Sequence, residues 1–154
     1  MKLQLDYRLY PEDFWRVEQT QWDKATLSDL DTLLFHGDLL FRCDAARFDH
    51  VDVPVLGFAY EFTESLLTVI AGGWARVEYC LLEWNHYLDL VRISDARILL
   101  SSNYTEQVAE VETALLLQTT RRFNTNLLEE ITFRFPFLQQ VTPFEQIQAA
   151  LRAI

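Results

Sequence analysis

Apolar and polar side chains alternate strictly at the start of the chain. Every second residue between Lys2 and Tyr10 is apolar or aromatic, which is the period of a β-strand with one buried face. A short helix is expected next, from Glu12 to Gln19, with Phe14, Trp15 and Val17 facing inward. The pattern therefore predicts a strand followed by a helical turn or two.

Shorter apolar runs predict further strands. Leu33 to Phe35 and Asp38 to Asp44 predict two short strands or one bent strand, with His36-Gly37 as the turn. A second group of strands, separated by short turns, is expected to form an antiparallel meander. Its members are Trp74 to Trp84, Tyr87 to Ile93 and Arg97 to Ser102.

The clearest helical period begins at Pro54. Apolar residues recur at three- and four-residue spacing from Val55 to Ile70, while Glu61 and Glu64 fall on the other side. Proline suits the first helical turn, where its missing N–H costs nothing, and Gly72-Gly73 supplies a left-handed terminator. This helix is expected to form the centre of the core.

The helical period returns in the last third of the chain. One long helix is predicted from about Glu106 until Pro136 stops it, with a break near Asn124 left open. Thr142 to Glu145 has the spacing of a capping box, so a final helix is expected from Phe144 to Arg152. The order of elements predicts an α+β protein. We expect one domain over residues 1–154, with an antiparallel sheet of about five to six strands packed on one face by the central helix and the C-terminal helices.

Composition supports a packed domain. The 154 residues are 50% hydrophobic and 14% aromatic, which is enough apolar surface to offset the entropy of ordering and excludes general disorder. No apolar run reaches the roughly 20 residues of a membrane span, and no export signal is recognised at the start. Cys43 and Cys80 lie in apolar strand-like runs and are interpreted as buried free thiols, so a reducing cytoplasm is expected.

Motifs for catalysis or cofactor binding are missing. There is no Gly-x-Ser-x-Gly turn, and the glycine pair is better explained as a helix stop than as a phosphate loop. His36 and His50 stand beside carboxylates without a known ligand spacing, and His86 is expected in an exposed turn. No carboxylate pair stands out for acid–base chemistry. We expect no enzyme, cofactor or metal.

Charge indicates the kind of partner. The chain has 23 acidic and 13 basic residues and a net charge of −10, which disfavours nucleic acid and an anionic membrane surface as ligands. Carboxylates interleaved with aromatic rings are typical of an interface that anchors by buried rings and is steered by charge. The equally weighted alternative is that the rings line the core and the acids only keep the surface soluble. The candidate partner-binding residues are Asp44, Asp49, Asp52, Glu78, Glu83, Trp84, Tyr87 and Asp89.

One stretch resembles a known protein type. Gly37 to Asp44, then Phe48, then Val53 to Ala59 form a glycine-led strand ending in Asp before a proline-initiated helix, and Val91 to Tyr104 ends in Ser-Ser-x-Tyr. This pattern, over roughly residues 33 to 138, resembles small immunity proteins of bacterial polymorphic and contact-dependent toxin systems. The resemblance implies direct binding and inhibition of a cognate toxin in the cytoplasm. The acidic charge agrees, because nuclease toxins are basic where they grip nucleic acid.

Two other classes of function stay open. A small enzyme or ligand-binding domain would use a pocket lined by Trp, Tyr and a few carboxylates. A structural homo-oligomer would associate through a sheet edge such as Arg97 to Ser102. The favoured hypothesis is an immunity protein that acts as a monomer in a 1:1 complex with a basic toxin domain.

Overall fold

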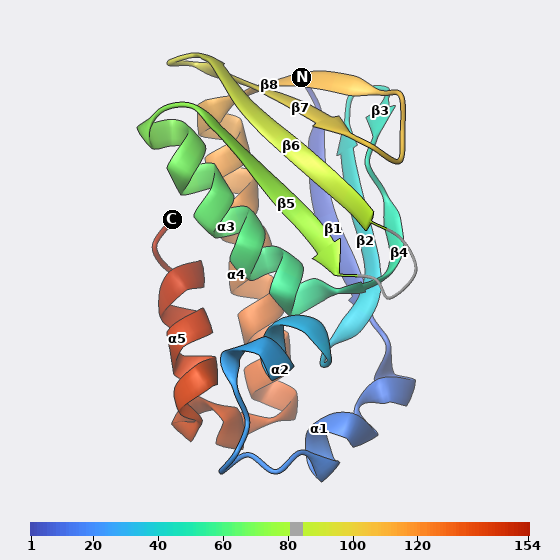
Figure 1. Cartoon of the computed structure of the whole chain (residues 1–154), viewed down its shortest axis with the longest axis vertical. Helices are drawn as coiled ribbons and strands as arrows, with labels where there is room; N and C mark the ends of the chain where they lie inside the picture. The colour runs from blue at the N-terminus through green and yellow to red at the C-terminus, as the bar shows by residue number, and fades with distance from the viewer. Residues whose placement is uncertain (81–84) are drawn as a thin grey trace.

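The structure, a computed structural model, describes residues 1–80 and 85–154. Within these residues the helices gather on one side of the molecule and the strands on the other (Figure 1). The strands are β1 (Leu3–Leu9), β2 (His36–Cys43), β3 (Ala46–Arg47), β4 (His50–Pro54), β5 (Trp74–Cys80), β6 (Asn85–Ser94), β7 (Arg97–Ser102) and β8 (Val108–Glu112). The helices are α1 (Trp15–Gln19), α2 (Leu27–Thr32), α3 (Val55–Ala71), α4 (Thr113–Arg134) and α5 (Thr142–Leu151), with 3₁₀ turns at Pro11–Asp13 and Pro136–Gln140.

The predicted α+β class is confirmed, but the strands form two antiparallel sheets instead of one. Sheet A contains β1 to β4, with β2 paired to each of the other three. Sheet B is the meander β5-β6-β7-β8. The buried apolar residues of both sheets and of α3, α4 and α5 form one hydrophobic cluster. Each sheet thus buries one face in a shared core, as period-two strands require.

Sheet A confirms the first predicted strand and corrects the second. β1 has the predicted alternation and pairs along its whole length with β2, from Leu3 opposite Cys43 to Leu9 opposite Gly37. The predicted turn at His36-Gly37 is wrong, because both residues belong to β2. Gly37 permits the close pairing, since a Cβ there would stand 2.2 Å from the carbonyl oxygen of Arg8. Cys43 is a buried free thiol, as predicted, and burial raises its pKa.

The region around residues 15–35 departs most from the expected pattern. Helix α2 was not predicted, and residues 33–35, expected as a strand, follow its end instead. Phe35 is buried with a positive φ of 58°, which turns the chain into β2. Of the three side chains expected to face inward from the first helix, Val17 is buried but Trp15 is 52% exposed.

Sheet B contains the predicted meander and one strand more. Its fourth strand, β8, lies where the long helix was expected to begin. Its residues alternate between exposed and buried, but Val111 also falls on the period of the following helix, which concealed the strand. β7 pairs with β6 on one side and β8 on the other, so the proposed association through the edge of Arg97 to Ser102 is wrong.

Helix α3 is the centre of the core, as predicted. It begins after Pro54 and ends at Gly72, whose φ of 134° supplies the expected terminator. Phe58, Phe62 and Leu66 are buried along it. The helix packs against β5, β6, β2, α2, α4 and α5, so it links both sheets to the other helices.

Helices α4 and α5 complete the helical side. α4 runs without a break through Asn124, which is 2% exposed. The Asn124 amide donates to Thr63 Oγ1 at 2.8 Å and to the Leu151 carbonyl at 3.1 Å, joining α4 to α3 and α5. The predicted capping box of the last helix is wrong, because its N-cap is Val141 without a side-chain hydrogen bond. A capping box exists instead in α2, between Thr26 and Asp29.

Candidate functional site

The solvent-facing side of sheet B carries an unusual mixture of rings, aliphatic side chains and charges. Val77, Leu88 and Leu100 point into the core, so the residues that alternate with them along each strand point outward. Strand pairing brings these outward residues into cross-strand rows. We call this set the outer face of sheet B: Trp74, Arg76, Glu78, Tyr87, Asp89, Val91, Leu99, Ser101, Val108 and Glu110.

Arg76 organises the polar half of the outer face. Its guanidinium lies 3.6 Å from the centroid of the Tyr87 ring and 5.3 Å from that of Trp74. The same group donates two hydrogen bonds to Asp89, at 2.7 and 3.1 Å, and this pairing holds the pKa of Arg76 above its ordinary value. Cation–π contact and a two-pronged ion pair together fix the two rings in one orientation.

Apolar side chains form the other half. Trp74 is 55% exposed and stands in one row with Val91 and Leu99. Val108, in the neighbouring row, is 56% exposed. Large apolar side chains gathered on one exposed face, with charges beside them, are typical of surfaces that bind another protein.

Three of the predicted partner-binding residues meet on this face. Glu78 lies directly opposite Tyr87, and Asp89 follows on the same side of β6. Glu83 and Trp84 lie outside the described residues. Sequence reasoning missed Trp74 as a site residue, although its place at the start of an alternating strand was a usable signal.

The other three predicted acids lie in sheet A or in its connecting turns and form internal contacts. Asp44, with a positive φ of 51°, accepts a hydrogen bond from the backbone N–H of Lys2 at 2.7 Å. Asp49 accepts from the backbone of Phe41 and forms an ion pair with Arg42 at 2.7 Å. These contacts give both carboxylates a structural role in and around sheet A.

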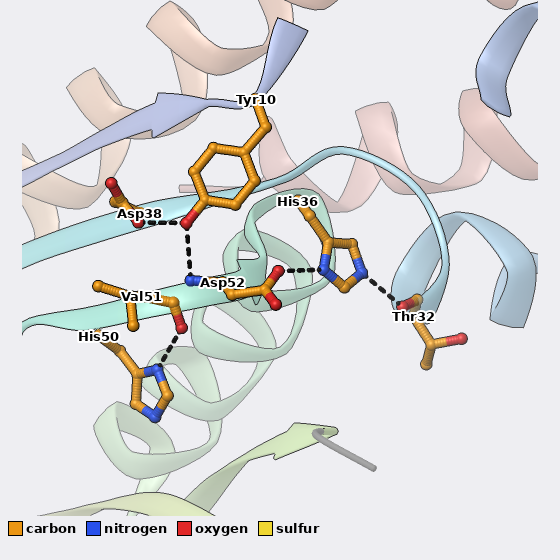
Figure 2. A network of polar contacts seen from close by, with 7 residues as sticks. All are labelled: Tyr10, Thr32, His36, Asp38, His50, Val51 and Asp52. Atoms are coloured by element: carbon orange, nitrogen blue, oxygen red, sulfur yellow. Dashed lines mark hydrogen bonds and ion pairs between the residues drawn. The ribbon is translucent and has the colours of Figure 1, made fainter. Parts of the chain in front are cut away.

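Asp52, the third of these acids, belongs to a polar network between β1, β2 and β4 (Figure 2). The Tyr10 hydroxyl donates to Asp38 and accepts from the Asp52 backbone N–H at 3.0 Å. Burial, and then the hydrogen bond to Asp38, raise the pKa of Tyr10 to about 12. The phenol therefore stays protonated and acts as a structural bridge.

His36 closes the same network at the end of α2. Its Nδ1 lies 3.0 Å from Asp52 Oδ1 and its Nε2 lies 3.0 Å from the Thr32 carbonyl oxygen (Figure 2). Both partners are acceptors, so both contacts are hydrogen bonds only when each ring nitrogen carries a proton. Asp52 also has a positive φ of 52°. The arrangement fastens α2 to sheet A.

The other two histidines contact each other across the two sheets. His50 Nε2 on β4 and His86 Nδ1 on β6 are 2.6 Å apart. The expectation that His86 is exposed in a turn is wrong, because it lies half-buried in β6. Desolvation is the main cause that lowers the pKa of His50. The two histidines are 36 positions apart along the chain, which explains why no sequence motif indicated this contact.

A carboxylate pair, also unpredicted, joins α2 to α3. Glu61 was expected on the polar side of its helix but is half-buried beside Asp31. Burial, followed by the charge of Asp31 and their mutual hydrogen bond, raises the pKa of Glu61 to about 7. Burial also raises the pKa of Asp31. Perturbed carboxylates occur at active sites, yet neither of the two cavities described next includes this pair.

Two cavities lie within the described residues 1–80 and 85–154. One, of about 280 Å³, lies between α4 and the residues after α5 and is lined partly by Arg121, Asn124 and Arg152. The other, of about 250 Å³, lies beside α2. Over residues 1–80 and 85–154 no group of three or more His, Cys, Asp or Glu side chains is placed to hold a metal ion. None of the helices in these ranges is long and apolar enough to cross a membrane.

Comparison of the chain with protein-family models, with curated proteins and with solved structures finds no match.

Proposed function

We propose that this chain is an immunity protein, similar to an antitoxin, that binds and neutralises a basic toxin domain. The outer face of sheet B is the surface that makes the contact. One observation carries the proposal: half-exposed Trp74 and the Arg76–Tyr87 stack stand among carboxylates on a chain with a net charge of −10.

The rings give this face its anchoring capacity. Most binding energy at a protein interface comes from a few central residues, and Trp, Tyr and Arg are the commonest of them. Trp74, Arg76 and Tyr87 are one residue of each kind, held in mutual contact before any partner arrives. Such preorganisation lowers the entropy lost on binding.

Charge supports a basic partner. On this face Arg76 is paired with Asp89, and Arg97 at its border lies 3.5 Å from Glu110. Glu78 adds a third carboxylate, so the carboxylates of this region outnumber the two arginines. Carboxylates around an apolar contact favour a cationic partner and speed association. Their attraction for that partner weakens as the salt concentration rises.

The experiment begins with the partner. The tagged protein is purified from its native cell, retained proteins are identified by mass spectrometry, and candidate toxins are expressed with and without it. We expect one basic protein whose toxicity is abolished and whose affinity falls as salt rises. If no candidate toxin binds this protein or is neutralised by it, the proposed immunity function is wrong.

A matched pair of variants tests the surface. Trp74→Ala removes a tryptophan that is 55% exposed beneath the guanidinium of Arg76. Trp15→Ala removes one that is 52% exposed beneath Arg16, at a similar 5.5 Å, on α1. We expect Trp74→Ala to weaken toxin binding at least about tenfold and Trp15→Ala to leave it within about twofold. Equal effects would show that the toxin binds elsewhere.

A further inference from the structure

The contact between His50 and His86 goes beyond this proposed function. Sheets A and B approach each other at β4 and the first residues of β6, where the two imidazole rings meet with Nε2 and Nδ1 2.6 Å apart. The ring centroids are 4.9 Å apart, with the planes at 65°. The two nitrogens share a direct hydrogen bond between separate strands, and a small separation of the rings makes room for an ion between them.

The Val51 carbonyl fixes which nitrogen of His50 carries the proton. His50 Nδ1 lies 2.8 Å from the Val51 carbonyl oxygen, which accepts only, so the proton of a neutral His50 ring lies on Nδ1 and its lone pair on Nε2 (Figure 2). Metal-binding histidines typically donate their second N–H to a carbonyl in this way, which orients the ring and strengthens the ligand.

Tyr104 holds both rings in place. Its ring stacks on His86 at 5.1 Å and meets the edge of His50 at the same distance. The Tyr104 hydroxyl donates to the Phe48 carbonyl at 2.8 Å, which anchors the phenol to the chain just before β4. The ligand nitrogens are therefore oriented by packing before any ion binds.

We propose that His50 and His86 form a two-histidine site for a divalent transition-metal ion of the Zn²⁺, Ni²⁺ or Cu²⁺ class. Imidazole nitrogen suits these ions, whereas Mg²⁺ and Ca²⁺ take oxygen ligands. A tetrahedral ion with bonds of about 2.0–2.1 Å needs the nitrogens about 3.3 Å apart. The rings must separate by about 0.7 Å from the 2.6 Å seen here, and the His86 proton must move from Nδ1 to Nε2 so that a lone pair of each ring faces the ion. Water completes the coordination, and the bound ion ties sheet A to sheet B.

The test is metal titration of the full chain without a histidine tag, followed by calorimetry and by ¹⁵N chemical shifts of the histidine side chains. ZnCl₂ and NiCl₂ are the probes, and MgCl₂ is the control ion. We expect one Zn²⁺ per chain, with shifts at His50 Nε2 and His86 Nδ1. His50→Gln and His86→Gln should each weaken binding at least about tenfold, while His36→Gln, which alters the third histidine, should keep it within about twofold.

Two results would overturn the proposed metal site. Absence of stoichiometric Zn²⁺ binding by the wild-type chain overturns the proposal, and so does unchanged binding in the His50→Gln and His86→Gln variants. The ¹⁵N shifts are measured on the wild-type protein, so they decide the matter even where a variant folds poorly. Neither result depends on whether a toxin partner exists.

Discussion

Glu61 should make the stability of this protein depend on pH, and Glu61→Gln should remove that dependence. Its pKa is raised from an ordinary 4.5 to about 7, first by burial and then by Asp31. As pH rises, the unfolded chain loses this proton before the folded protein does. The stabilisation is therefore complete below about pH 4.5 and is lost progressively up to about pH 7.

The magnitude follows from the pKa difference. A change from 4.5 to about 7 corresponds to about 3 kcal/mol, at about 1.4 kcal/mol per pH unit. Glu61 is only half-buried, so solvent screening reduces the expected loss to about 1–2 kcal/mol. Glutamine mimics the protonated acid. The variant should match the wild type near pH 5 and exceed its stability by about 1–2 kcal/mol near pH 8.

The assay is urea unfolding at half-unit steps from pH 5 to pH 8. Taking the difference in unfolding free energy between wild type and Glu61→Gln cancels the contributions of groups that titrate alike in both proteins. Glu64→Gln, at an exposed position one turn along α3, is the matched control and should show no such slope. Asp31→Asn should lower the pKa of Glu61 and so narrow the pH range over which stability is lost. A difference between wild type and Glu61→Gln that stays constant with pH refutes the reasoning.

Three further changes test the packing of the helices by urea unfolding. Gly57→Ala should destabilise by about 2–3 kcal/mol, although Ala normally favours a helix, because its Cβ would stand 1.9 Å from the Asp31 carbonyl oxygen. Asn124→Ala should cost about 2–3 kcal/mol, because two buried hydrogen bonds to α3 and α5 are lost. Thr26→Ala should cost about 1 kcal/mol by removing the cap of α2.

Controls exist on the same helices. Asn126→Ala, at an exposed position of α4, and Ser28→Ala, at an exposed position of α2, should each change stability by less than about 0.5 kcal/mol. A Gly57→Ala protein as stable as wild type would show that α2 does not lie against α3 as described. Equal losses for Asn124→Ala and Asn126→Ala would contradict the buried amide contacts.

Local periodicity was enough for the elements that bury one continuous face. β1 and α3 were predicted from alternation and from three- and four-residue spacing, because each pattern is complete within its own segment. The same local argument failed where two patterns overlap. Val111 fits both the strand β8 and the helix α4, and only pairing with β7 selects the strand.

For the candidate site, too, the sequence indicated some residues and tertiary contacts decided the others. The sequence named Glu78, Tyr87 and Asp89 as candidates because acids and rings are interleaved there, and strand pairing brings the three to one side of the β5–β6 hairpin. Trp74 and Arg76 gain their role only from contact with the neighbouring strand, which a list of acids and aromatics does not contain.

The sequence by itself determined the α+β class, the acidic surface, the central helix and the first strand. Tertiary structure alone decided the division into two sheets, the Asp31–Glu61 pair and the His50–His86 contact. The physical reason is the range of the interactions. Hydrophobic period and helix termination act over a few residues, whereas strand pairing and side-chain meetings between residues 30 or more apart depend on how the whole core closes.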